Sequence, residues 1–403
     1  MTAALSTDRA TTRRHAGFFG VVFVSLLVVA FVLSTGETSD PGRPVSLLLG
    51  AALGFVFERG RFCFFCLFRD AIEQRVTRPL ISIVTAIAVG AVGYALTFGL
   101  YLPNPKGEGL PPGAHIAPVS VPLVLGAAAF GLGMVLSGAC ISGHLYRIGQ
   151  GYLRAIPALL GALAGFGLGF FTWNSLYLEQ VSESPVLWLP RWLGYSWSLV
   201  LLLAVCAVAA VVLVRIDRGD AEPTTRRLGA SFADLRELLL VRRWSPAVTG
   251  AIVGVIGIFA YQRTTPLGVT SQLSTISRSY LDSRGALPEV LHGIDMMRGC
   301  VAIVSDAITN NGWLVIGFVA ASLAAAAGGG RFKIQKPTVG NSFTALVGGV
   351  LLGWGSLTAL GCTVGVLLSG TQAFALSGVV FLVVVFASVW LGIRLRLHRL
   401  FGA

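Results

Sequence analysis

Long stretches without a charged residue constrain the fold of this chain more than any other feature. A membrane-spanning helix needs about 20 consecutive apolar residues, and several uncharged stretches come close to that length or exceed it. They are residues 17–35, 79–102, 118–143, 155–178, 192–214, 244–262 and 307–330, with 337–393 long enough for at least two helices and 44–57 a shorter addition. We therefore expect an all-α polytopic membrane protein with about 9–13 helices.

The composition and the placement of charge agree with this class. Hydrophobic residues make up 55% of the chain and charged residues 12%, with a mean hydropathy of +0.78, which is far from a soluble globular protein. The net charge of +12 does not indicate nucleic-acid binding, because the arginines cluster between the uncharged stretches. Segments 59–78 and 215–243 are rich in Arg, whereas 103–117 and 179–190 hold none. By the positive-inside rule, both termini and the 215–245 segment are expected in the cytoplasm.

A glycine and cysteine motif occurs twice on this background. Residues 126–145 and 348–367 share the pattern G-x4-G-x-G-x6-C-x-x-G-x-L, and every matched pair is offset by 222 residues. The match includes Cys140 in the first copy and Cys362 in the second. Duplicated halves in a membrane protein are typical of transporters, whose substrate site lies between the halves.

The charge map predicts that the two copies cross the membrane in opposite directions. The helix before Cys140 follows an Arg-poor segment and leads to Arg147, whereas the helix before Cys362 follows basic residues at 331–336. This is an inverted-repeat arrangement, for which we expect short re-entrant helices. The expected organisation is an N-terminal segment with an extra transmembrane helix (1–43), a first half (44–214), a basic cytoplasmic linker (215–245), a second half (246–393) and a cytoplasmic tail (394–403).

Weaker similarities extend the duplication. Gly50 and Gly54 have the same spacing as Gly250 and Gly254. Residues 59–72 and 298–308 both place R-x-C before D-A-I, at spacings that differ by one. On this basis Cys63 is predicted to match Cys300.

Six cysteines give the strongest indication of chemistry: Cys63, Cys66, Cys140, Cys206, Cys300 and Cys362. Cys206 lies in the middle of an apolar stretch and is interpreted as a packing residue. Cys63 and Cys66 form a lone C-x-x-C, but a structural zinc site needs four ligands, and no His-x3–5-His spacing accompanies it. No metal or other cofactor is expected, and a dithiol redox role for this pair stays open as an alternative.

Thiols along a membrane path favour a ligand that presents sulfur, since a thiol is soft, polarisable and a weak hydrogen-bond donor. Arginines beside the cysteines favour an anion. They are Arg59, Arg61, Arg147 and Arg298, although anchoring at the cytoplasmic surface accounts equally well for Arg59 and Arg147. No P-loop motif is present, so ATP-driven transport by this chain is not indicated.

Taken together, these motifs resemble the YeeE/YedE family of sulfur transporters. The resemblance is carried by G-R-F-C-F at 60–64, S-G-A-C-I-S-G-H-L-Y-R at 137–147, T-P-L-G-V-T at 265–270, R-G-C at 298–300 and G-C-T-V-G-V-L-L-S-G at 361–370. It spreads over roughly residues 44–393. The first half has Gly138-Ala139-Cys140 where the family often has G-G-C.

The resemblance implies import of thiosulfate across the bacterial inner membrane, without enzymatic catalysis, through a body whose short helices point inward. It implies that Cys63, Cys140 and Cys362 contact the substrate through weak S–H···S interactions, with Cys140 central. Cys300 and Arg61 complete the expected binding residues. A small cytoplasmic sulfur-carrier protein is expected as a separate partner. The alternatives are a membrane thiol oxidoreductase or sulfur-relay protein using Cys63 and Cys66, and a transporter of a different sulfur or selenium compound.

Overall fold

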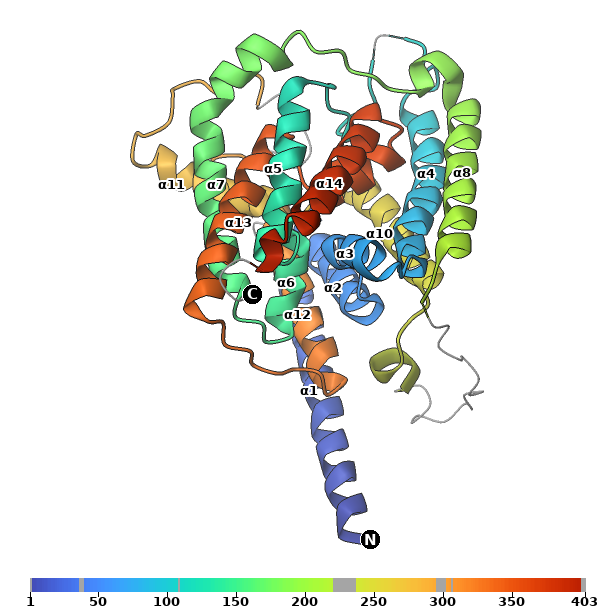
Figure 1. The fold of residues 1–403 in the computed structure, drawn as a ribbon, viewed down its shortest axis with the longest axis vertical. Coiled ribbons are helices and arrows are strands. Elements are labelled where there is room, and N and C mark those ends of the chain that lie inside the picture. Colours follow the sequence, from blue (N-terminus) through green and yellow to red (C-terminus); the bar gives the residue numbers. More distant parts are fainter. Residues whose placement is uncertain are drawn as a thin grey trace.

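The protein is a bundle of long and short α-helices in a computed structural model (Figure 1). The structure describes residues 2–35, 40–107, 109–219, 237–294, 302–305 and 307–399. Within these ranges, 7 helices are long and apolar enough to cross a membrane, or up to 8 if one bent pair counts as a single span. The expected all-α polytopic architecture is confirmed.

The helices form two series with the same order of long and short members. The first series is α2 (Gly42–Gly60), the short α3 (Phe64–Gln74), α4 (Ile81–Tyr101), α5 (Val121–Ser137), the short α6 (Ile141–Gly149) and α7 (Ala155–Leu176). The second is α10 (Pro246–Arg263), the short α11 (Ser271–Asp282), α12 (Asn310–Gly328), α13 (Val339–Thr358), the short π-helix η4 (Thr363–Gly370) and α14 (Leu376–Arg394). Helix α1 (Thr2–Thr35) precedes both series, and α8 (Pro190–Ile216) follows the first. Single turns complete the order: η1 (Arg78–Leu80), η2 (Tyr177–Val181), η3 (Glu237–Val241) and η5 (Leu397–Arg399).

The duplicated glycines show that the two series are inverted relative to each other. A methyl group added at Gly126 of α5 would lie 2.8 Å from the carbonyl oxygen of Gly355 in α13. A methyl group at Gly133 would lie 2.7 Å from the carbonyl oxygen of Gly348. Each glycine therefore packs on the duplicate of the other, which requires α5 and α13 to run in opposite directions. The absence of side chains lets the two backbones approach this closely.

A second pair of glycine contacts obeys the same symmetry. Gly50 of α2 packs on α12, where an added methyl group would lie 1.9 Å from the carbonyl oxygen of Leu314. Gly250 of α10 packs on α4, where the corresponding distance to the carbonyl oxygen of Ser82 is 2.1 Å. The first helix of each half thus packs against the third helix of the other half. The two halves interlock, and the short helices lie among the long ones.

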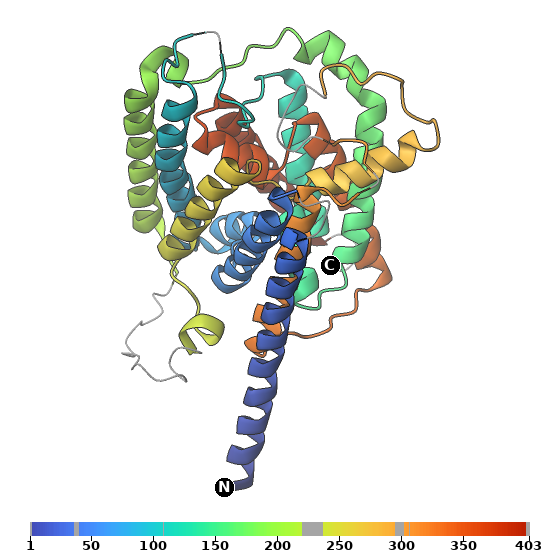
Figure 2. The same cartoon turned by 180° about the vertical axis from the view of Figure 1, so that it is seen from behind.

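Helices α1 and α8 lie at the periphery. The amino-terminal part of α1 extends beyond the rest of the molecule, and α8 lies beside α4 (Figures 1 and 2). Leu26 and Ala30 attach α1 to Leu47 of α2 and Ala321 of α12. Most other side chains of the apolar part of α1, and most of α8, are exposed, as expected for surfaces that face lipid.

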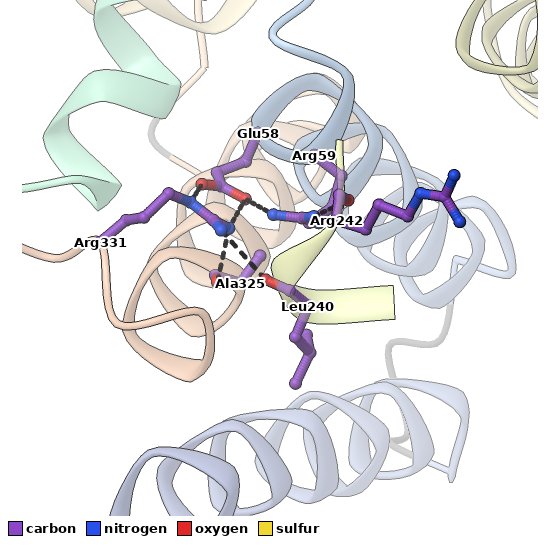
Figure 3. A network of polar contacts seen from close by, with 6 residues as sticks. All are labelled: Glu58, Arg59, Leu240, Arg242, Ala325 and Arg331. Carbon is purple, nitrogen blue, oxygen red and sulfur yellow. Dashed lines mark hydrogen bonds and ion pairs between the residues drawn. The ribbon is translucent and has the colours of Figure 1, made fainter. Parts of the chain in front are cut away.

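A buried ion pair holds the end of α2, directly before the segment that carries Cys63. Arg331, which follows α12, donates from Nε and Nη2 to the two carboxylate oxygens of Glu58, both at 2.9 Å. The Glu58 side chain is fully buried. Arg331 also donates to the carbonyl oxygen of Leu240, and Arg59 donates to that of Arg242 (Figure 3). The network joins the first half, the second half and the segment that connects them.

Replacing Glu58 by Gln is expected to destabilise the protein by about 3 kcal/mol, because it leaves the Arg59 and Arg331 cations without a buried counter-charge. Thermal unfolding in detergent would measure the loss as a lower Tm. The Arg69–Asp70 pair offers a control, since its two side chains are 38% and 33% exposed. Asp70→Asn should change the stability by less than about 1 kcal/mol. Equal losses in the two variants would contradict a specific role for the buried pair.

Candidate functional site

Three helix breaks each place a cysteine at the beginning of a short helix. Cys63 precedes α3, Cys140 precedes α6 and Cys362 precedes η4. The break before Cys140 is made by Gly138, which ends α5 in the left-handed conformation with φ 88°. Between α13 and η4 the axis bends by 41°, and Gly361 has φ 154°. Glycine permits both turns because it has no side chain to clash with the backbone.

Two of the thiols lie together at Gly143, the third residue of α6. A methyl group added at Gly143 would lie 3.2 Å from Sγ of Cys63 and 3.5 Å from Sγ of Cys140. The backbone N–H of Gly143 donates to Sγ of Cys140 at 3.4 Å, and the Ser142 hydroxyl lies 3.2 Å from the same sulfur. Gly143 therefore leaves room for the two sulfurs, which lie within hydrogen-bonding reach of each other.

The third break joins this site through Thr363, the residue after Cys362. The Thr363 hydroxyl lies within hydrogen-bonding reach of the Cys140 thiol, so the amino-terminal ends of α3, α6 and η4 converge on one place. Helix amino termini carry partial positive charge and unpaired N–H groups, and they favour anions. Cys63 and Cys140 are 0% exposed and Cys362 is 1% exposed, so the site is closed to solvent on both sides in this structure.

A fourth thiol extends the cluster toward a cation. Cys66 lies in the first turn of α3, within hydrogen-bonding reach of Cys63. Arg147 of α6 donates from Nη2 to Sγ of Cys66 at 3.0 Å and from Nη1 to the carbonyl oxygen of Gly138 at 2.8 Å. A guanidinium thus lies next to the thiols and is held by two helix breaks. None of the five cysteines in the described residues forms a disulfide.

Two of the other arginines expected near the site lie elsewhere. Arg61 is exposed and ends α2 in the left-handed conformation with φ 50°. Arg59 is buried in the Glu58 network (Figure 3). Arg298 and Cys300 fall in residues 295–301, outside the described residues, so their expected roles stay predictions. Arg147 is the expected arginine that the fold brings to the thiols.

The order of the helices contradicts the predicted match between Cys63 and Cys300. Cys63 precedes the first short helix of its half, and the corresponding short helix of the second half is α11, which begins after Thr270. Cys300 comes after α11, between the second and third helices of that half. The equivalent of Cys63 is therefore Thr270, whose side chain is fully buried. Segments 59–72 and 298–308 have similar sequences, but they occupy different positions in the repeat, so the predicted match was wrong.

Cys206 lies apart from this site, on the peripheral helix α8, and it is 8% exposed.

The sequence interpretation missed Thr363, although it directly follows a cysteine of the repeated motif. Gly143 was visible as the glycine of C-x-x-G in both copies, but its contact with Cys63 was not. The latter contact joins residues 80 positions apart, and no local pattern reports it.

Comparisons with known proteins find similarity to sulfur transport proteins. A model of a sulphur transport family matches residues 59–391. The thiosulfate transporter TsuA of Escherichia coli is 27% identical over 369 residues, which cover 85% of this chain and 92% of that protein. TsuA of Spirochaeta thermophila is 26% identical over 346 residues, with 82% and 92% covered. The probable transporter YedE of Escherichia coli is 28% identical over 170 residues, with 41% and 38% covered.

Proposed function

The chain belongs to the sulphur transport family, and we propose that it imports thiosulfate or a closely related sulfur-bearing anion. The observation that carries this proposal is that three short helices begin at one buried place, where Cys63 and Thr363, the residue after Cys362, both lie next to Cys140. The two TsuA relatives are thiosulfate transporters by name, which supports thiosulfate as the substrate. Transport of another sulfur or selenium compound is the nearest alternative.

The chemistry of the site suits an anion with a soft end and a charged end. The terminal sulfur of thiosulfate accepts weak S–H hydrogen bonds from the thiols, which are polarisable groups of the same softness. The helix amino termini and the Arg147 guanidinium stabilise the negative charge. Each contact is weak, and conduction requires sites that release the ion as readily as they take it up. The anion passes intact, with Cys140 as the central contact and Cys63 and Cys362 on either side.

The distribution of charge orients the proposed path in the membrane. Both termini and the basic 215–245 segment lie on the cytoplasmic side of a bacterial inner membrane, by the positive-inside rule. In this orientation α3 and α6 belong to the cytoplasmic half and η4 to the outer half. The anion would then meet Cys362 before Cys140 and Cys63. A separate small sulfur-carrier protein would receive the sulfur after release into the cytoplasm.

Uptake of radiolabelled thiosulfate by liposomes that contain the purified protein tests this function. We expect accumulation above that of empty liposomes, saturation with concentration, and little uptake of labelled sulfate, which lacks the soft terminal sulfur. Excess unlabelled selenosulfate should compete, because it presents a still softer terminal atom. Sulfate uptake equal to thiosulfate uptake, or no uptake of thiosulfate at all, would refute the proposal.

A further inference from the structure

A histidine from the loop between α4 and α5 lies buried against η4. His115 is 3% exposed, although residues 102–120 connect two membrane spans. A methyl group added at Gly361 would lie 3.1 Å from Nε2 of His115, and one added at Gly370 would lie 3.6 Å from its Cδ2. One edge of the ring therefore lies between Gly361 and Gly370, with Nε2 beside Gly361, the residue that precedes Cys362.

The Nε2 atom of His115 is buried and has no hydrogen-bond partner among the described residues. A buried polar atom without a partner is costly, and most such atoms in folded proteins are paired. Burial lowers the pKa of His115 to about 4, so the ring is neutral near pH 7. A neutral imidazole still offers one N–H donor, and an oxygen acceptor at Nε2 selects the tautomer with its proton there.

The loop that carries His115 is fixed to the body on both sides of the ring. The Tyr261 hydroxyl donates to the carbonyl oxygen of Pro112 at 2.8 Å. The N–H of Val119 donates to the carbonyl oxygen of Pro185 at 3.0 Å. These bonds hold the imidazole in place before any ligand arrives. A preorganised donor binds with less loss of conformational entropy than a mobile one.

We propose that His115 is a specificity-determining residue that donates its Nε2–H to an oxygen of the transported anion as the terminal sulfur reaches Cys362. The inference rests on the proposed function and adds a contact for the oxygen-bearing end of the substrate. The thiols recognise the soft sulfur and His115 recognises the oxygens, so an ion must present both to bind well. Sulfide has no oxygen to accept this bond.

Three variants test this contact by thiosulfate uptake in liposomes. His115→Leu fills similar space without a donor, and we expect its apparent KM to rise about 10- to 100-fold, the effect of losing one hydrogen bond to a charged group. His115→Gln can place an amide N–H at a similar reach, and its KM should stay within a few-fold of the wild type. His292→Ala removes an exposed histidine from another loop and should transport normally.

The outcomes separate this contact from the general function and from folding. Wild-type failure to transport thiosulfate would refute the proposed function itself. A normal KM in folded His115→Leu would overturn the role of His115, and so would an equal loss in folded His115→Leu and His115→Gln. Gel filtration and thermal unfolding establish folding, and His115→Met, also without an N–H donor, replaces the Leu variant if that variant does not fold. A raised KM in His115→Met together with a nearly normal KM in His115→Gln supports the contact.

Discussion

Replacing Cys140 by Ala is expected to reduce thiosulfate uptake to the level of empty liposomes. Cys140 is the thiol with contacts to all three short helices: it lies within hydrogen-bonding reach of Cys63 and Thr363, and the Ser142 hydroxyl lies 3.2 Å from its sulfur. Its removal interrupts the series of weak contacts at the middle, and no other sulfur can take its place. The protein should still fold, because the change removes a single atom from the core.

Two further cysteine variants show whether sulfur itself matters. Cys140→Ser keeps a small hydrogen-bonding group but replaces the soft atom by a hard oxygen, so uptake should remain far below the wild type. Cys206→Ala is the matched control, because Cys206 is also largely buried but lies on α8. It should transport at the wild-type rate. Full uptake by Cys140→Ser at equal protein content would contradict recognition by softness.

Replacing Gly143 by Val is expected to stop uptake while leaving all the thiols present. A side chain at this position begins 3.2 Å from Sγ of Cys63 and 3.5 Å from Sγ of Cys140, so its methyl groups would press on the two sulfurs and displace them. The new atoms also crowd Ala139, whose Cβ would lie 2.9 Å away. Such overpacking typically destabilises a protein by about 1–3 kcal/mol, which thermal unfolding would detect. Liposome uptake measures the loss of transport.

The control for this variant is a glycine with space around it. Gly99 lies in α4, and no described atom beyond the adjoining part of its own helix lies within 4 Å of the position that a Cβ would take. Gly99→Ala should therefore transport normally and be at least as stable as the wild type, because alanine favours a helix over glycine. If Gly143→Val were folded and as active as Gly99→Ala, the placement of Cys63 and Cys140 beside Gly143 would not matter for transport.

The sequence predicted the membrane class and the inverted pair because both depend on local signals. Uncharged stretches report membrane spans, and the arginines between them report direction. The glycine spacing that suggested duplication corresponds to contacts in the structure, where Gly126 packs on Gly355 and Gly133 on Gly348. The cysteines of the repeated motif lie at helix breaks, directly before α6 and η4.

Contacts between distant segments were not predictable in this way. The approach of the 102–120 loop to Gly361 leaves no periodic pattern in the sequence, so His115 gave no signal. Arg61 was expected to face the anion from its position two residues before Cys63, but the left-handed turn leaves it exposed. The predicted match of Cys63 with Cys300 was wrong because a short sequence similarity does not show whether a residue comes before or after the short helix α11.

The location of the substrate's terminal atom tests the central claim most directly. Selenosulfate carries selenium where thiosulfate carries its terminal sulfur, so anomalous diffraction from crystals soaked with it would show where this atom binds. We predict a selenium peak in the space beside Gly143, bordered by the sulfurs of Cys63 and Cys140. The peak should disappear in Cys140→Ala. A bound selenium remote from all of the thiols, and unchanged in that variant, would contradict the account.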